Sequence, residues 1–188
     1  MTPTFTDLGV PEDLISVLAK QGIESPFAIQ TLTISDALKR RDVCGKAKTG
    51  SGKTLAFSLP AVAHTERNQQ GKPTTLMLTP TRELANQISG VVEPLADARN
   101  LRPIAVYGGT NIDKQIEKIT QGIDIIIATP GRLIDLIDRK AIDVALVERV
   151  VVDEADRMAD MGFLPQVEWI LRHIEVDHQT MLFSATLD

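Results

Sequence analysis

Short runs of β-branched and aliphatic residues alternate along this chain with stretches in which apolar residues recur at helical spacing. The runs predict six strands, which end near Cys44, Leu78, Tyr107, Ala128, Val152 and Phe183. Runs 104–107 and 125–128 are apolar enough that we expect them to be buried on both faces of a sheet. Strands that alternate with helices in this way are typical of an α/β fold with a largely parallel central sheet and helices on both faces.

The apolar spacing also predicts helices between the strands. Near the N-terminus, Pro11 suits a first helical turn and Gly22 a helix end, which predicts a helix over 12–21, and a second is predicted over 27–39. Apolar residues recur every three or four positions across 84–95 and 163–174, so each stretch predicts a helix with one face toward the core. Pro94 is expected to kink the end of the first of these, because proline lacks an amide hydrogen.

Composition and charge narrow the class of protein. With 188 residues, 43% hydrophobic and 24% charged, we expect one globular domain spanning 1–188. Cys44 is the only cysteine, so it has no disulfide partner in the chain, and we expect a small buried residue in a reducing compartment. No apolar run is long enough to cross a membrane and the N-terminus does not resemble a signal peptide, which predicts a soluble cytoplasmic protein without membrane contact. The net charge of −5 disfavours a broad basic face, so nucleic-acid contacts are expected to be local.

A polar cluster follows each predicted strand at once. The six clusters are Ala47, Lys48, Thr49, Gly50, Ser51, Gly52, Lys53 and Thr54; Pro80, Thr81, Arg82 and Glu83; Gly108 and Gly109; Thr129, Pro130, Gly131 and Arg132; Asp153, Glu154, Ala155 and Asp156; and Ser184, Ala185 and Thr186. Ligands of open α/β sheets bind beyond the carboxyl ends of the strands. Any one cluster alone is typical of an ordinary turn, but six parallel strands would gather all of them at one edge and so predict a binding site there.

The first cluster, 47–54, lies between a predicted strand and a predicted helix and has the pattern of a phosphate-binding loop. Backbone amides of such a turn can point at phosphate oxygens, and Gly50 and Gly52 allow an approach that a Cβ would block. Lys53 would add a positive charge, and Thr54 would place its hydroxyl on Mg²⁺. Ala47 stands where the general pattern has glycine, so an ordinary glycine and serine loop is the alternative.

The fifth cluster places two carboxylates after a strongly apolar strand. Asp153 could hold Mg²⁺ opposite Thr54, directly or through water, because this ion takes few carboxylate ligands and keeps several waters. Glu154 could then orient and deprotonate the attacking water. The alternative is a solvated cap at the start of a helix, where acidic residues are common.

The ordered set of clusters resembles the DEAD-box family of ATP-dependent RNA helicases, whose D-E-A-D tetrapeptide occurs here at 153–156. The family's adenine-reading Q motif resembles 22–30, with an aromatic residue, Phe5, ahead of it. The resemblance implies a RecA-like P-loop domain, ATP and Mg²⁺ as cofactors, a Gln30 amide that reads the adenine edge, and a Phe5 ring that packs on the base. Without the resemblance, Phe5 would be a core or terminal packing residue and Gln30 a helix-surface residue.

The resemblance also assigns the middle clusters to RNA. Segments 80–83, 108–109 and 129–132 match family segments that hold the sugar–phosphate backbone, a contact that tolerates any base sequence. The last cluster resembles a coupling segment, in which Ser184 and Thr186 bond to Asp156 and link the ATP site to RNA. Taken singly, Arg82 and Arg132 would as readily be surface or ion-pair arginines, and 184–186 a turn after a strand.

The family's second α/β lobe, with its arginine fingers, has no counterpart in these residues. We therefore expect this chain to be the ATP-binding lobe of an RNA helicase. Such a lobe needs a second lobe as partner and hydrolyses ATP poorly when it is alone. The alternative is a stand-alone module that binds nucleotide and RNA without turnover. A different P-loop NTPase or a DNA helicase fits the adenine-reading segment less well. Lys48 and Ala159 differ from the family's usual residues, but neither change removes an expected catalytic group.

Overall fold

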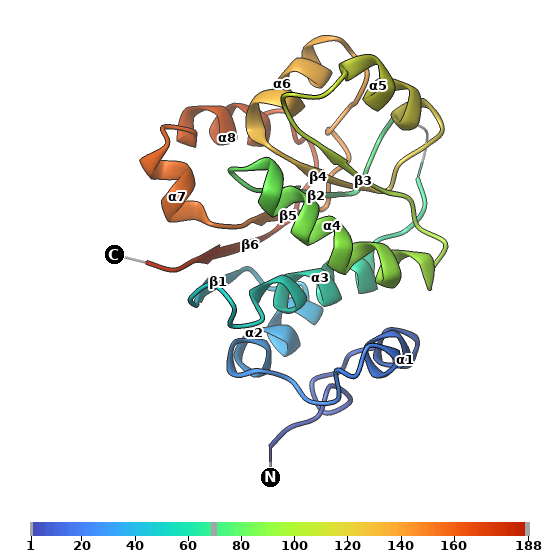
Figure 1. Cartoon of the computed structure of the whole chain (residues 1–188), viewed down its shortest axis with the longest axis vertical. Coiled ribbons are helices and arrows are strands. Elements are labelled where there is room, and N and C mark those ends of the chain that lie inside the picture. Colours follow the sequence, from blue (N-terminus) through green and yellow to red (C-terminus); the bar gives the residue numbers. More distant parts are fainter. Residues whose placement is uncertain (1, 69–70, 187–188) are drawn as a thin grey trace.

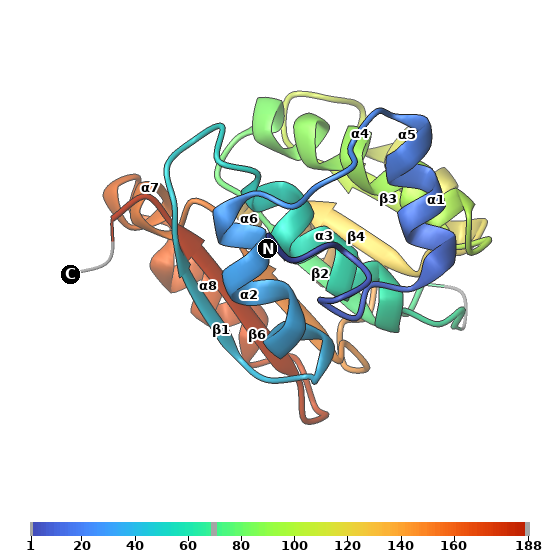
Figure 2. The ribbon, with the colours of Figure 1, turned by 90° about the horizontal axis from the view of Figure 1, so that it is seen from below.

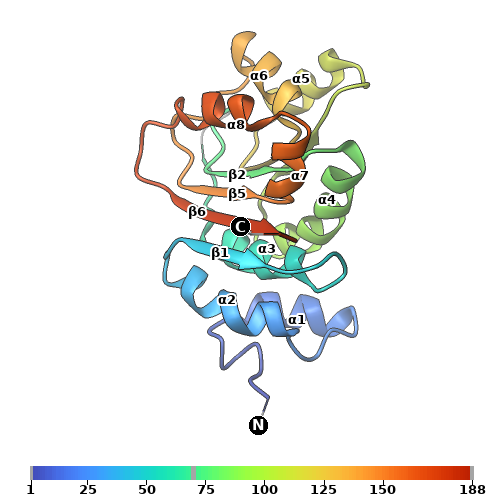
Figure 3. The same ribbon diagram turned by 90° about the vertical axis from the view of Figure 1, so that its left-hand side faces the viewer.

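A six-stranded sheet, in which all neighbouring strands are parallel, forms the centre of the fold. The computed structural model describes residues 2–68 and 71–186, and the strand order is β1-β6-β5-β2-β4-β3 (Figure 1). The strands are β1 (Val43–Lys46), β2 (Thr75–Leu78), β3 (Pro103–Val106), β4 (Ile125–Ala128), β5 (Arg149–Val152) and β6 (Gln179–Ser184). Figure 3 shows β2, β5, β6 and β1 as successive neighbours. The six predicted strands and their expected parallel arrangement are confirmed.

Helices cover both faces of this sheet. They are α1 (Glu12–Lys20), α2 (Ala28–Leu38), α3 (Lys53–His64), α4 (Arg82–Asp97), α5 (Ile112–Thr120), α6 (Pro130–Asp138), α7 (Ala155–Asp160) and α8 (Leu164–Leu171). Successive residues of β2 point to opposite faces, as strand geometry requires: Met77 belongs to the apolar cluster formed with α1 to α4, and Leu76 to the cluster formed with α5 to α8. The α/β class with helices on both faces is therefore confirmed.

Position in the sheet decides how deeply each strand is buried. Of the four interior strands, β2, β4 and β5 are buried at every residue, and β6 is half-buried at Thr180 and Leu182. β3 lies at one edge, where Ala105 and the following Tyr107 are only half-buried. Burial on both faces is thus confirmed for 125–128 and wrong for 104–107, because an edge strand has one neighbour and less cover.

β1 is the other edge strand, and Figure 2 shows it beside β6. Cys44 is exposed there, so the expectation of a buried cysteine is wrong. The helices predicted over 12–21 and 27–39 agree with α1 and α2 to within one residue at each end. α4 continues past Pro94 to Asp97. Within the described residues, none of the helices has the length and apolar character needed to cross a bilayer.

Candidate nucleotide and RNA site

The parallel strands bring the six polar clusters to one edge of the sheet, because their carboxyl ends all point the same way. Contacts between clusters that are distant in sequence show this directly. Lys53 at the start of α3 contacts Glu154, which lies 101 residues further along the chain, and Asp156 contacts Thr186. The carboxyl edge therefore forms a single surface. The residues that the sequence assigned to ATP, RNA or coupling lie in segments that directly follow a strand, with the exception of Phe5 and Gln30.

The turn between β1 and α3 has the geometry of an anion-binding loop. Gly50 and Gly52 have φ of +80° and +85°, left-handed conformations that glycine adopts readily. Gly52 also has no room for a side chain, since a Cβ there would lie 2.5 Å from Gln30 Nε2. The Ser51 hydroxyl donates to the Lys48 carbonyl and closes the turn. Because α3 begins at Lys53, its first backbone amides face the edge as donors for an anion.

Lys53 joins this loop to the acidic cluster. Its Nζ lies 2.7 Å from Glu154 Oε1 and 4.0 Å from Asp153 Oδ1, and all three side chains are buried. Burial raises the pKa of Asp153 to about 6, although the nearby Lys53 opposes this shift. Glu154 has φ of +54°, a left-handed conformation that is strained for a residue with a Cβ and is often found at functional sites. One cation thus lies between two buried carboxylates beside the phosphate-loop candidate.

Asp153 also has the properties of a cation ligand. Its Oδ1 is buried and has no hydrogen-bond partner among the described residues. A buried acceptor in this position costs free energy unless water or a cation contacts it. Carboxylate and hydroxyl oxygens are ligands that Mg²⁺ prefers, and Thr54 lies in the first turn of α3 directly after Lys53. Asp153 and Thr54 therefore fit the ion that the phosphate loop implies.

The burial of Asp153 predicts an effect on stability. With metal chelated, Asp153→Asn should raise the free energy of unfolding at pH 7.5 by roughly 1–3 kcal/mol. The folded-state pKa of about 6 exceeds the ordinary value of 3.8, so the folded protein binds this proton more tightly. The stabilisation that this proton gives to the folded state is complete below about pH 3.8 and is lost as the pH rises through 6. Urea unfolding should show a smaller gain at pH 5 than at pH 7.5, and a variant less stable than the parent at both values would contradict this origin.

The segment assigned to adenine packs directly on the phosphate loop. Gln30 Nε2 donates to the Gly52 carbonyl at 3.0 Å, and Gln30 Oε1 accepts from the Phe27 amide at 2.9 Å. Gln30 is only 2% exposed, so the alternative of a helix-surface residue is wrong. The amide thus links the start of α2 to the turn before α3.

Phe5, expected to pack on the adenine, is buried, whereas Phe27, to which no role was assigned, is exposed beside the loop. Phe5 is 2% exposed and lies in the core cluster with Leu14 and Leu18, so it presents no open face to a base, and the core alternative describes its placement. Phe27 is 59% exposed, and its ring lies beside Gly52, where an added Cβ would be 2.6 Å from Phe27 Cδ2. The sequence reasoning missed Phe27, although its position inside the 22–30 segment was a usable signal.

The clusters assigned to RNA surround a second part of the edge. Thr81 Oγ1 accepts from the Leu84 amide at 3.3 Å and caps α4. The next residue, Arg82, holds its guanidinium 5.1 Å from the centre of the Tyr107 ring, and Glu83 is exposed beside it. A cavity of about 390 Å³ is lined by Pro80, Gly108, Thr129, Pro130, Gly131, Arg132, Asp135, Phe163 and Gln166. Residues of three clusters therefore line one hollow.

The coupling residues contact one another. Asp156 Oδ2 accepts from the Thr186 hydroxyl at 2.9 Å and from the Thr186 amide at 3.1 Å, and Ser184 Oγ accepts from the Asp156 amide at 3.3 Å. These bonds join the start of α7 to the last residue of β6 and to Thr186 beyond it. The residues that the sequence assigned to coupling therefore lie in direct contact.

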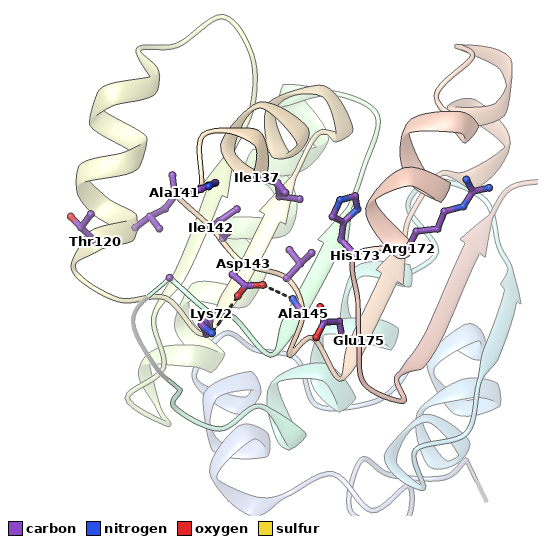
Figure 4. Close-up of a pocket in the computed structure, with 14 residues that line it drawn as sticks. Lys72, Thr120, Ile137, Ala141, Ile142, Asp143, Ala145, Arg172, His173 and Glu175 are labelled. Carbon is purple, nitrogen blue, oxygen red and sulfur yellow. Dashed lines mark hydrogen bonds and ion pairs between the residues drawn. The ribbon is translucent and has the colours of Figure 1, made fainter.

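A larger cavity, of about 810 Å³, lies at the opposite edge of the sheet (Figure 4). Its lining comes from the ends of α5, α6 and α8 and from the chain that leads into β5. Asp143 contacts Lys72 at 3.3 Å and accepts from the Ala145 amide at 2.9 Å. Its lining shares no residue with the predicted ATP, RNA or coupling sets, so this cavity and the predicted chemistry lie at opposite edges.

Known proteins share both the sequence and the fold. The chain is 44% identical to DEAD-box ATP-dependent RNA helicase 9 of Oryza sativa subsp. japonica, over 96% of this chain and 29% of that protein. It is 43% identical to the RNA helicase CrhR of Synechocystis sp., over 100% of this chain and 38% of that protein. A DEAD box protein from the hyperthermophile Methanococcus jannaschii has a crystal structure that matches with a TM-score of 0.91 and 35% identity, over 98% of this chain and 50% of that one.

These matches establish the family, although they cover only part of each relative. The chain spans well under half the length of the two helicases named above, so their whole-protein activities do not transfer directly. The RecA-like fold expected from the resemblance is confirmed by the structural match. The DEAD/DEAH box helicase family profile matches residues 27–188, and the chain belongs to this family.

Proposed function

We propose that this chain is the ATP-binding and RNA-backbone-binding lobe of an ATP-dependent RNA helicase, which unwinds or remodels RNA as it hydrolyses ATP. The contact of Lys53 with Asp153 and Glu154, beside a glycine turn at the N-terminus of α3, is the observation that carries the proposal. A buried cation between two carboxylates, next to unused backbone donors, suits a triphosphate and its metal ion.

In this proposal Lys53 exchanges one anionic partner for another. In the structure it neutralises Glu154 at 2.7 Å. When the phosphates of ATP occupy the turn 48–52, Lys53 turns to their oxygens and leaves the Glu154 carboxylate free. Glu154 then orients and deprotonates the water that attacks the terminal phosphate. Bound Mg²⁺, held by Asp153 and Thr54, would neutralise charge on the phosphates.

Base recognition falls to the segment that packs on the loop. The Gln30 amide has a second hydrogen and a second lone pair beyond its bonds to Gly52 and Phe27, and these suit the donor and acceptor on the adenine edge. Phe27, exposed beside Gly52, offers the ring face on which a base can stack. We assign the stacking role to Phe27 in place of Phe5.

Gln30→Ala should reduce the preference for ATP over GTP by about tenfold, since one complementary amide pair is worth roughly 1–3 kcal/mol. Competition of the two nucleotides against a fluorescent analogue measures this preference, with the exposed Gln21→Ala as the matched control. A preference equal to that of the parent chain would remove Gln30 from base reading. Loss of binding to both nucleotides would instead indicate that Gln30 only supports the Gly52 turn.

The RNA-binding part of the proposal rests on the hollow of about 390 Å³ and its surroundings. Exposed glycine amides at 108–109, the N-terminus of α6 and the arginines Arg82 and Arg132 are donors that suit phosphates and ribose without reading the bases. The net charge of −5 predicts weak binding by this lobe alone.

We further propose that 1–188 form one domain and that a second lobe supplies the remaining RNA contacts and an arginine to the transition state. Such an arginine contributes about 10³- to 10⁵-fold in rate at related sites. RNA-stimulated ATP hydrolysis should therefore be near background for this chain and appear when a second lobe is present. RNA-independent turnover by the chain alone would contradict the division into lobes. The single cysteine supports a cytoplasmic location.

A further inference from the structure

Gln115, on the buried side of α5, connects two segments that the family resemblance places at RNA, the loop around 108–109 and the segment 129–132. It is 8% exposed. Its Nε2 donates to Thr110 Oγ1 at 2.8 Å and to the Tyr107 carbonyl at 3.3 Å, and its Oε1 accepts from Arg132 Nη1 at 2.8 Å. The orientation of the amide is unambiguous, because a guanidinium can only donate and a carbonyl can only accept.

Two further hydrogen bonds complete the same network. Arg132 Nη2 donates to the Thr110 carbonyl at 3.1 Å, and Thr110 Oγ1 donates to the Tyr107 carbonyl at 3.0 Å. The loop 107–110 is thus tied both to α5 and to the first turn of α6, which carries Arg132. The forked guanidinium makes both bonds possible, because Nη1 donates to Gln115 and Nη2 donates to Thr110.

The loop needs this support because its centre has little packing of its own. Gly108 and Gly109 are exposed, and an added Cβ on either would meet nothing within 4 Å among the described residues. Their position therefore depends on the hydrogen bonds at both ends of the loop. Tyr107, at the front of the loop, also lies under the Arg82 guanidinium at 5.1 Å, so the network holds the backbone of a residue whose ring contacts a second arginine.

We propose that Gln115 is a positioning residue for nucleic-acid binding: it fixes the spacing between the loop 107–110 and the start of α6, so that both present their donors to one RNA backbone. Gln115 itself touches no RNA. This inference rests on the proposed RNA-binding function. It adds the residue that keeps two of the RNA-contacting segments at a fixed distance from each other.

Gln115→Met tests the inference, because methionine has a similar length and lacks both polar groups of the amide. In a fluorescence anisotropy titration with a single-stranded RNA in the presence of MgATP, the dissociation constant should rise about tenfold, as expected for the loss of a buried hydrogen-bond network. The dependence of affinity on salt should keep its slope, because no phosphate contact is removed. Gln121→Met, at the exposed end of the same helix, is the matched control and should match the parent chain.

Arg132→Lys separates positioning from simple charge. It keeps the charge but loses the fork, so it should weaken RNA binding as much as Gln115→Met, and the double variant should be no weaker than either single one. Full affinity for Arg132→Lys, or additive losses in the double variant, would overturn the network. If Gln115→Met fails to fold, Thr110→Val removes the hydroxyl that Gln115 contacts and should give the same loss of RNA affinity.

Amide hydrogen exchange decides the positioning claim without RNA. The amides of Gly108 and Gly109 should exchange several-fold faster in Gln115→Met, while those of α3 should be unchanged. Equal exchange in the parent and the variant would overturn the inference. A third outcome is faster exchange in the variant together with a parent chain that binds no RNA at low salt. That result would confirm that Gln115 supports the loop and would contradict the proposed RNA-binding function.

Discussion

Glu154→Gln is expected to abolish RNA-stimulated ATP hydrolysis in a protein that carries both lobes, while MgATP binding changes by less than about threefold. Loss of a general base lowers the rate by about 10²- to 10⁴-fold. The glutamine side chain is almost the same size, and its oxygen can still accept from Lys53 at the position where Glu154 Oε1 lies 2.7 Å away, so the nucleotide site should keep its shape. Single-turnover hydrolysis and a binding titration on the same preparation measure the two effects.

The matched control for this change is Asp160→Asn, an exposed carboxylate at the end of α7. It removes the same charge from the other end of the segment 154–160 and should hydrolyse ATP at the parent rate. Turnover of Glu154→Gln within about threefold of the parent would exclude the general-base role, since that role demands a far larger loss. Equal losses in both variants would point to the charge of the segment and away from the chemistry of Glu154.

Lys53→Ala should weaken MgATP binding by at least about 100-fold, because the site loses its only cation in contact with Asp153 and Glu154 among the described residues. Breaking a buried ion pair by removing one partner costs about 3–5 kcal/mol, so the variant should also unfold at lower denaturant concentration. Calorimetry with MgATP measures the affinity, and urea unfolding measures the stability. Lys53→Met, which retains most of the aliphatic stem, separates lost charge from lost packing.

The exposed Lys20→Ala at the end of α1 is the control for this titration. It should bind MgATP with the affinity of the parent. If a folded Lys53→Met variant retained parental affinity, the phosphates would lie elsewhere, and the turn 48–52 would lose its assignment. Weak binding by a folded Lys53→Met variant would place the loss of affinity in the charge of Nζ.

Much of the fold could be predicted because it depends on local patterns. Apolar runs such as 125–128 and 150–152 are uninterrupted, and each is followed by turn residues, so strand positions followed from short windows of sequence. Such windows carry no information on the order of strands in the sheet. The runs at 104–107 and 125–128 look equally apolar, and only pairing makes the first an edge strand. The exposure of Cys44 has the same cause, because β1 is the opposite edge.

The candidate site divides in a similar way. Parallel strands alone imply that the clusters meet at one edge, so the proximity of Lys53 to Asp153 was a consequence of topology. Topology does not determine which individual side chains contact one another. Phe5 and Phe27 both precede the loop in sequence, and only three-dimensional packing puts the first in the core and the second beside Gly52. Gln115 carried no sequence signal, because its role depends on Tyr107, Thr110 and Arg132 meeting it in space.

The two edges of the sheet differ in what they can do. The cavity of about 810 Å³ at the opposite edge is larger than the hollow beside the RNA clusters, yet the Lys53 cation, its two buried carboxylate partners and the strained Glu154 backbone all lie at the carboxyl edge. Chemical groups with perturbed environments are better guides to a reactive site than volume is. MgATP should therefore bind at the carboxyl edge.

A titration of the ¹⁵N-labelled chain with a non-hydrolysable ATP analogue and Mg²⁺, followed by amide resonances, tests this assignment most directly. The amides of Gly50, Gly52, Lys53 and Thr54 should shift together with that of Asp153, at one common affinity, while Asp143 in the opposite cavity should not move. Shifts that gather around Asp143 and the ends of α5 and α6, with the turn 48–52 unaffected, would contradict the assignment of the nucleotide to the carboxyl edge.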